Sequence, residues 1–292
     1  MRLLPASLSC LALAACGHRD DGPPLDQQWT KVVELSRPRV PAADGTLIAH
    51  AIDTIYPRRD EIRQALETAR TAGQVPILSP DEAAAVEALT SWRDEKGGLP
   101  QRTCAELAEG GRRILAAITL AELSLATAPP GAEQTRAEAV LYLGHRLRAE
   151  GVNMLDVTAG SEVADKAIRW ATANHVAPTP AWSELAPGPE LLPRAIAAEA
   201  QCMVELARQP GEVRLARAEL DGLRRFYLSA VADIERGGSD EDIVARLAAL
   251  SDKAHADRGH PTLAVLVPAL GRSAERLLEQ RRRYHAFLRG IR

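Results

Sequence analysis

Proline and glycine divide this 292-residue chain into short segments that are rich in helix-forming residues. Alanine and leucine dominate these segments, whereas aromatic residues make up only 3% of the chain, so few segments resemble a β-strand. Apolar residues recur with helical spacing, as in the set Leu107, Ile114, Leu115, Ile118 and Leu125. The sequence therefore predicts an all-α fold. We expect an irregular multi-helix bundle or helical array of about ten helices with mostly antiparallel neighbours, because the loops are mostly short.

Start and stop signals predict where the helices lie. Ser79-Pro80-Asp81-Glu82 combines a serine N-cap, a proline in the first turn and acidic residues near the positive end of the helix dipole. Helices are predicted at 27–35, 45–55, 57–72, 80–96, 103–127, 133–150, 152–175, 191–209, 212–236, 240–256 and from 261 to the C-terminus, with a kink at Pro268. Gly110, Gly111 and Gly144 fall inside helices, where we expect them to allow close helix packing.

The N-terminus has the three-part layout of a cleavable export signal. Arg2 supplies a positive charge, residues 3–13 are mostly apolar, and the small residues Ala14 and Ala15 follow. The apolar stretch is about half as long as a membrane-spanning helix needs. We expect a signal peptide at 1–15, a polar tether at 16–28 and a single helical domain at 29–292. Any subdivision of that domain is expected near 176–190, the longest irregular stretch.

The segment Leu13-Ala14-Ala15-Cys16-Gly17 resembles the lipobox of bacterial lipoproteins. In that class a diacylglycerol is attached to the cysteine thiol, and the amine freed by cleavage is often acylated with a fatty acid such as palmitate. The resemblance implies that Cys16 is the first mature residue and that acyl chains anchor the tether in a lipid bilayer. Gly17, in place of aspartate, favours the outer membrane of the cell envelope, facing the periplasm. The alternative is an ordinary secretory signal with a chance cysteine.

Two of the four cysteines are expected to form a disulfide. Cys10 leaves with the signal and Cys16 takes the lipid, so Cys104 and Cys202 remain as an even pair in an oxidising compartment. The alternative is two separate buried thiols, because free cysteine packs as a small hydrophobic residue.

Common catalytic motifs are absent from the sequence. It lacks the H-E-x-x-H of zinc proteases, the E-x-x-H pairs of di-iron bundles, C-x-x-C-H, the glycine-rich nucleotide loops and G-x-S-x-G. The net charge of −3 gives no overall field that would attract a nucleic acid. We therefore expect no cofactor, no bound metal and no nucleic-acid partner.

Two polar clusters are candidates for binding. The helix at 152–175 is unusually polar, and its candidate groove residues are Asn153, Asp156, Asp165 and Lys166. The alternative is helix packing through Gly160 with the acidic residues in water. A basic amphipathic segment near the C-terminus could rest on anionic lipid, and its candidate contact residues are Arg281, Arg282 and Arg283. Its alternative is a solvated helix end whose cations complement the helix dipole.

Two further clusters have weaker patterns. One helix face carries a potential anion-binding trio at i, i+3, i+4 spacing: Tyr142, His145 and Arg146. A predicted loop carries histidines and aspartates of the kind that bind metals, but without a third anchored ligand: His255, His260, Asp252 and Asp257. Solvated side chains are the alternative at both places.

The sequence favours a membrane-anchored envelope lipoprotein that is a non-catalytic helical scaffold or binding module, with an envelope protein or another ligand as its partner. One alternative is an envelope hydrolase with dispersed catalytic residues, which would need converging carboxylates with separated pKa values. The other is a carrier of apolar molecules, which would need a large dry cavity.

Overall fold

The computed structural model describes residues 23–38, 43–100, 103–104, 107–208, 215–257 and 267–290. These residues form helices and loops without a strand, which confirms the predicted all-α fold. The helices are α1 (Leu25–Ser36), α2 (Thr46–Ile55), α3 (Arg59–Ala72), α4 (Pro80–Asp94), α5 (Leu107–Ala126), α6 (Glu133–Glu150), α7 (Met154–Ala173), α8 (Pro180–Glu184), α9 (Leu191–Arg208), α10 (Arg217–Glu235), α11 (Asp240–Ala256) and α13 (Leu270–Arg289). A short 3-10 helix, η1 (Tyr56–Arg58), joins α2 to α3.

Local capping explains several helix boundaries. The Ser79 hydroxyl accepts a hydrogen bond from the Glu82 backbone N–H, and the Glu82 carboxylate accepts one from the Ser79 N–H at 2.8 Å. Ser239 and Asp242 form the same reciprocal pair at the start of α11, at 3.1 Å in both directions. Each pair satisfies two N–H groups that have no partner within the helix. Helices α4 and α11 consequently begin at their predicted residues, Pro80 and Asp240.

Several helix boundaries differ from the sequence prediction, and two of them bear on the tether and on the predicted kink. Helix α1 begins at Leu25, so residues 25–28, which we assigned to the tether, are helical. Pro268 precedes α13 instead of kinking it, and its carbonyl accepts a hydrogen bond from the Leu270 N–H at 2.8 Å. Proline lacks an N–H, which makes it better suited to the approach to a helix than to its interior.

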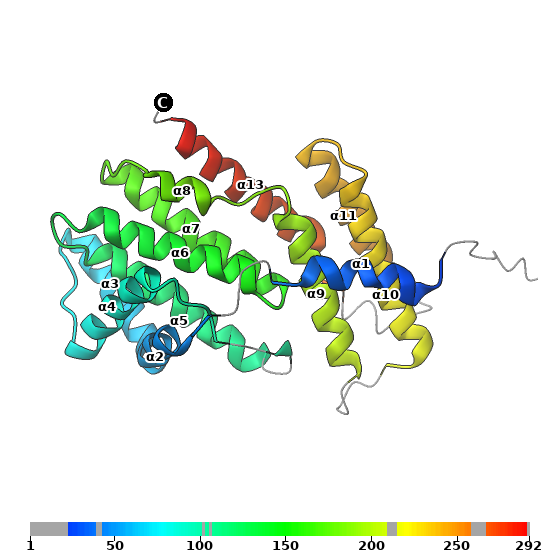
Figure 1. Ribbon diagram of the computed structural model, residues 1–292, viewed down its shortest axis with the longest axis horizontal. Coiled ribbons are helices and arrows are strands. Elements are labelled where there is room, and N and C mark those ends of the chain that lie inside the picture. The colour runs from blue at the N-terminus through cyan, green and yellow to red at the C-terminus, as the bar shows by residue number, and fades with distance from the viewer. Residues whose placement is uncertain are drawn as a thin grey trace, which may run out of the picture.

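A first hydrophobic core occupies the left half of Figure 1 and is built mainly from α2 to α8. Its fully buried side chains include Trp92, Leu120, Leu141 and Trp182. Helices α6 and α7 form a hairpin at its centre and cross at Gly144 and Gly160. A Cβ atom on Gly144 would lie 2.7 Å from the Gly160 carbonyl oxygen, so this crossing requires glycine.

A second core occupies the right half of Figure 1 and combines α1 with α9, α10, α11 and most of α13. Trp29 of α1 is buried there, with the Arg224 guanidinium of α10 5.2 Å from the centre of its ring system. This is a cation–π arrangement that fixes the first helix to a core formed much later in the sequence. The first described helix therefore belongs to the C-terminal half of the molecule.

Two helices contribute to both cores. The start of α7 supplies Met154 to the second core and its later turns supply Ile168 to the first, while α13 supplies Leu277 to the second and Tyr284 to the first. The chain passes from the first core to the second between α8 and α9, within the region 176–190. Because α1, α7 and α13 cross this division, the two cores are not consecutive pieces of sequence.

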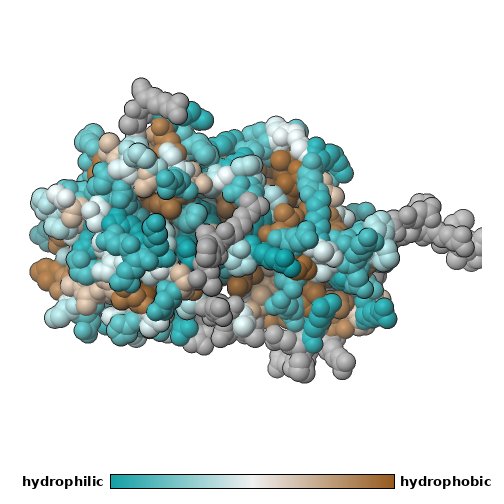
Figure 2. All heavy atoms as spheres, in the orientation of Figure 1, coloured by the Kyte–Doolittle hydropathy of each residue, from teal (hydrophilic) through white to brown (hydrophobic). Residues whose placement is uncertain are grey.

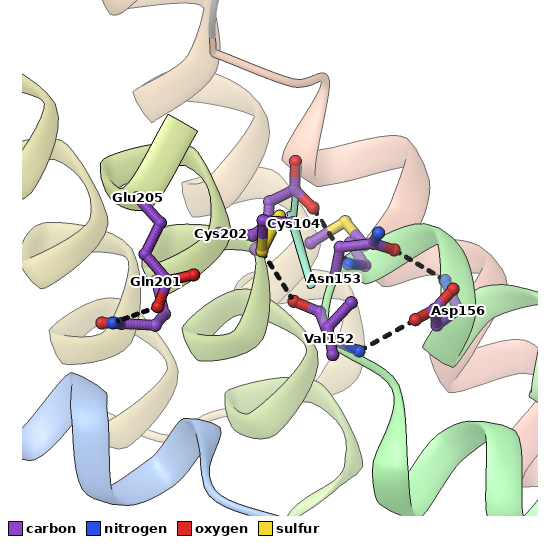
Figure 3. The surroundings of a disulfide bond; sticks show 9 residues. Cys104, Val152, Asn153, Asp156, Gln201, Cys202 and Glu205 are labelled. Atoms are coloured by element: carbon purple, nitrogen blue, oxygen red, sulfur yellow. Dashed lines mark hydrogen bonds between the residues drawn. A yellow bond between two sulfur atoms is a disulfide. The ribbon is translucent and has the colours of Figure 1, made fainter. Parts of the chain in front are cut away.

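A disulfide between Cys104 and Cys202 links the two cores, as predicted. Cys104 precedes α5, Cys202 lies in α9, and their Cα atoms are 5.3 Å apart across 98 positions of sequence. Both side chains are buried beside the α6–α7 turn, where the Cys104 sulfur lies 4.0 Å from the Val152 carbonyl oxygen (Figure 3). The bond thus ties the segment before α5 to a helix of the other core.

Candidate functional site

Two of the predicted groove residues close the α6–α7 turn. The Asn153 side chain caps α7 by accepting a hydrogen bond from the Asp156 N–H at 2.9 Å. The Asp156 carboxylate accepts one from the Val152 N–H, also at 2.9 Å (Figure 3). Both side chains are buried. Through these hydrogen bonds, the Asn153 and Asp156 side chains satisfy backbone N–H groups of the turn.

The other two predicted groove residues face different neighbours. Asp165 is buried and pairs with Arg169 at 2.9 Å and with Arg283 of α13 at 3.3 Å. Lys166 pairs with Glu122 of α5 at 2.6 Å. Adjacent residues of a helix point in different directions, so the polar face that we predicted on α7 divides among three surroundings.

Buried arginines lie beside the same α6–α7 turn. We call this turn the junction, because α9 contacts it. Arg194 of α9 donates to the carbonyl oxygens of Arg148 and Gly151, at 2.5 and 3.2 Å. Arg148 donates to the Leu185 carbonyl oxygen at 2.7 Å, and burial lowers its pKa to about 10. A guanidinium with this pKa is still charged at neutral pH. Arg194 thus satisfies carbonyl groups at the end of α6, whereas Arg148 satisfies the carbonyl group of the residue that follows α8.

The junction also holds titratable groups from α9 and α10. Glu199 accepts a hydrogen bond from the Met154 N–H at 2.9 Å, and burial followed by the charge of Asp156 raises the Glu199 pKa. Tyr227 is fully buried, and burial raises its pKa as well. Both groups are packed into the helix interface, where their surroundings favour the neutral form.

The three predicted surface arginines of α13 form ion pairs within the molecule. Arg281 and Arg282 pair with acidic residues in the first turn of α11, at 3.2 and 3.1 Å. Arg283 pairs with Asp165 of α7. These contacts fix α13 to its two neighbours. Their contact with a lipid surface stays a prediction.

The trio on α6 is divided by packing. The Tyr142 hydroxyl donates to the Gly97 carbonyl oxygen at 3.0 Å, and Arg146 pairs with Glu150. Tyr142 and Arg146 line an open groove of about 450 Å³ between α4, α6 and α8. His145 is half-buried, and burial followed by the positive charges of Arg148 and Arg146 lowers its pKa to about 4.

The residues proposed as metal ligands are only partly covered by the structure. The His255 Nε2 atom lies 2.9 Å from the Val267 carbonyl oxygen, which occupies that nitrogen. His260 lies outside the described residues. Within the described ranges no three histidine, cysteine, aspartate or glutamate side chains come together as metal ligands.

A second groove lies between α3 and α7, which both pack against α5. Its volume is about 790 Å³, within the range of small-molecule and peptide sites. Apolar side chains from all three helices line it: Leu66, Ala69, Leu125, Ala126 and Trp170. An aromatic ring with aliphatic neighbours can bury apolar parts of a ligand.

Charged side chains form the rim of this groove. Arg70 pairs with Glu67 at 2.6 Å, and Lys166 pairs with Glu122 across the floor. Arg63 lines the groove without an ion pair among the described residues. An apolar floor with paired and unpaired charges around it suits an amphipathic ligand.

Sequence reasoning identified Lys166 but missed the rest of this groove. A signal was present on α3, where Arg63, Glu67 and Arg70 follow i, i+4, i+7 spacing and so share one face. Nothing in the sequence showed that α3 and α7 would both pack against α5 and leave a groove between them.

Comparison with known proteins gives no relative: the chain matches no family model, no curated protein and no solved structure. Cys16 lies outside the described residues, so its lipidation stays an expectation. Of the helices within the described ranges, none combines the length and apolar character required to cross a membrane.

Proposed function

We propose that this chain is a bacterial envelope lipoprotein, anchored by acyl chains on Cys16, whose helical domain is a non-catalytic binding module. The observation that carries the proposal is the Cys104–Cys202 disulfide. Disulfides persist in oxidising compartments such as the periplasm, and the export signal comes from an independent part of the chain. The pairing therefore supports export, and Gly17 favours the outer membrane as the anchoring bilayer.

Acylation would hold the domain firmly at the membrane. A single fatty chain binds only marginally, at about 0.8 kcal/mol per buried CH₂ group, but two or three chains anchor a protein stably. The tether begins at Cys16 and the first helix at Leu25. This short connection keeps the binding module close to the bilayer.

The α3–α5–α7 groove is the binding site in this proposal. Its two glutamates, Glu67 and Glu122, are each paired with a cation, which favours binding over acid–base chemistry. The apolar cavity between α2, α5 and α6 has a volume of about 30 Å³, room for a water-sized molecule, which does not favour a carrier of lipids.

Metabolic labelling with palmitate in a bacterial host tests the anchor. We expect the wild-type protein to incorporate label, Cys16→Ser to lose all of it, and Cys10→Ser to retain it. The last variant is a matched control, because it removes a cysteine from the same apolar segment. Equal labelling of wild type and Cys16→Ser, or no labelling of wild type, contradicts the anchor.

Capture of ligands from native envelope tests the groove. Ala69→Arg places a long side chain in the groove, whereas Thr68→Arg adds the same charge on the exposed side of α3. We expect the captured species to be lost with Ala69→Arg and kept with Thr68→Arg, with unchanged circular dichroism in both. Equal capture by the two variants would place binding elsewhere.

A further inference from the structure

An exposed apolar loop lies beside the groove, between α3 and α4. In residues 74–78, which we call the distal loop, Val75 is 70% exposed and Ile77 is 97% exposed. The intervening Pro76 lines the groove and Leu78 packs against the first core. The loop thus directs alternate side chains outwards, and its two outward residues are both aliphatic. Figure 2 shows apolar surface at this end of the molecule.

The size of the apolar tip favours a bilayer over a protein. Two aliphatic side chains and the edge of a proline present on the order of 250 Å² of apolar surface. A stable protein interface buries about 800 Å² on each partner. A convex tip of this size can instead insert between lipid headgroups, where it needs no complementary surface.

Arginines around the distal loop suit an anionic surface. Arg63 and Arg70 of α3 and Arg169 of α7 line the groove that Pro76 borders, and all three are exposed. The acidic neighbours are Glu67, which pairs with Arg70, Asp165, which pairs with Arg169, and Glu122, which pairs with Lys166. Asp81 lies in the first turn of α4. Basic residues at such a surface are attracted to anionic headgroups within a Debye length.

The distal loop and the start of the described chain lie at opposite ends of the molecule. In Figure 1, the loop between α3 and α4 is at the left end, whereas α1 begins at the right end. A domain anchored through the segment before α1 would direct the loop away from its own bilayer. The loop would then meet a second membrane.

We propose that the distal loop inserts Val75 and Ile77 into the interface of an anionic bilayer while Arg63, Arg70 and Arg169 contact its headgroups. Insertion itself is independent of the anchor, but the bridging of two membranes rests on the proposed function. The protein would then hold two membranes together, one through Cys16 and the other through the distal loop.

Vesicle bridging tests this proposal. Protein purified from its native envelope is reconstituted into bead-bound phosphatidylcholine vesicles, and fluorescent acceptor vesicles are added. We expect acceptors containing 30% phosphatidylglycerol to be captured about 10-fold more than pure phosphatidylcholine acceptors. Ile77→Asp should reduce this capture about 10-fold or more, and Arg63→Gln should reduce it by a smaller factor.

Leu155→Asp is the matched control, because Leu155 is another exposed aliphatic residue, at 52%, on α7. It should leave capture unchanged. Capture that Ile77→Asp does not alter, equal capture of both acceptor types, or no capture above protein-free beads overturns the proposal. Capture only of acceptors that also carry protein would identify a contact between two copies and overturn it as well.

This experiment distinguishes an absent Cys16 anchor from an absence of loop insertion. Protein that washes off the bead-bound vesicles lacks the Cys16 anchor. The same protein is then floated in solution with phosphatidylglycerol-containing vesicles. Flotation that is lost with Ile77→Asp and kept with Leu155→Asp supports insertion without the anchor, and its absence overturns insertion.

Discussion

Burial and two neighbouring arginines determine the protonation of His145. Burial is the main cause that lowers its pKa to about 4, and the charges of Arg148 and Arg146 add to it. The pKa in the unfolded chain is about 6.5, so the unfolded state binds this proton more readily. Stability that depends on neutral His145 is therefore fully present above pH ~6.5 and is lost as the pH falls towards 4.

Replacing His145 with glutamine should weaken this pH dependence. Between pH 7.5 and 4.5, we expect the wild-type free energy of unfolding to fall by about 2 kcal/mol more than that of His145→Gln. Urea denaturation at the two pH values measures the difference. His50→Gln, at an exposed position of α2, should behave like wild type. An unchanged pH dependence in His145→Gln would contradict the lowered pKa of His145.

At the scale of helices, the α6–α7 hairpin depends on two glycines that face each other. A Cβ atom on Gly160 would lie 2.6 Å from the Gly144 carbonyl oxygen and 2.8 Å from the Arg148 backbone nitrogen. Backbone atoms cannot move aside cheaply, so any side chain would separate the helices. Gly111 of α5 differs, because the nearest atom to its Cβ would be Leu155 Cδ2 at 3.8 Å.

Alanine substitutions should separate these two kinds of glycine. We expect Gly160→Ala to lower the free energy of unfolding by about 1 to 3 kcal/mol, because overpacking outweighs the gain in helix propensity. Gly111→Ala should raise it by up to about 1 kcal/mol, because alanine favours the helix and the site has room. Thermal and urea unfolding of both variants measure this. Equal effects in the two would contradict the close crossing.

The starts of the helices were easier to predict from the sequence than the helices against which each one packs. Ser79 and Ser239 begin their helices through local contacts, which a sequence pattern records directly. Asp165 and Arg283 pair across 118 positions, and no local pattern indicates such a partner. Periodicity identifies the apolar face of a helix but not the helix that covers it.

The same limit explains why the surroundings of the site residues could not be predicted from the sequence. Asn153 and Asp156 looked like a polar groove, because a sequence shows polar residues but not the backbone groups that they satisfy. The open groove beside Trp170 depends on how α3 and α7 sit on α5, and only the packed structure gives that arrangement.

At the scale of the whole molecule, shared helices and one disulfide join the two cores. Helices α7 and α13 contribute side chains to both, and Cys104–Cys202 adds a covalent link beside the junction. The bond closes a loop across 98 positions, so it removes much conformational freedom from the unfolded chain. Its effect should therefore appear as stability of the whole molecule.

Removal of the disulfide should lower the free energy of unfolding by up to about 4 to 5 kcal/mol. We expect the double variant Cys104→Ala/Cys202→Ala and the reduced wild-type protein to unfold at similarly lowered urea concentrations. The variant serves as its own control, since a reductant should not affect it. A wild-type midpoint that is insensitive to reductant would contradict a stabilising bond.

The intact mass of the mature protein, purified from its native envelope without reductant, tests the central claim most directly. We expect a chain that begins at Cys16, carries the added mass of a diacylglycerol and a fatty acyl group, and has two hydrogens fewer than the dithiol form. A mass corresponding to a chain that begins at Met1, without fatty acid and with free thiols, would contradict export, the anchor and the covalent link between the cores.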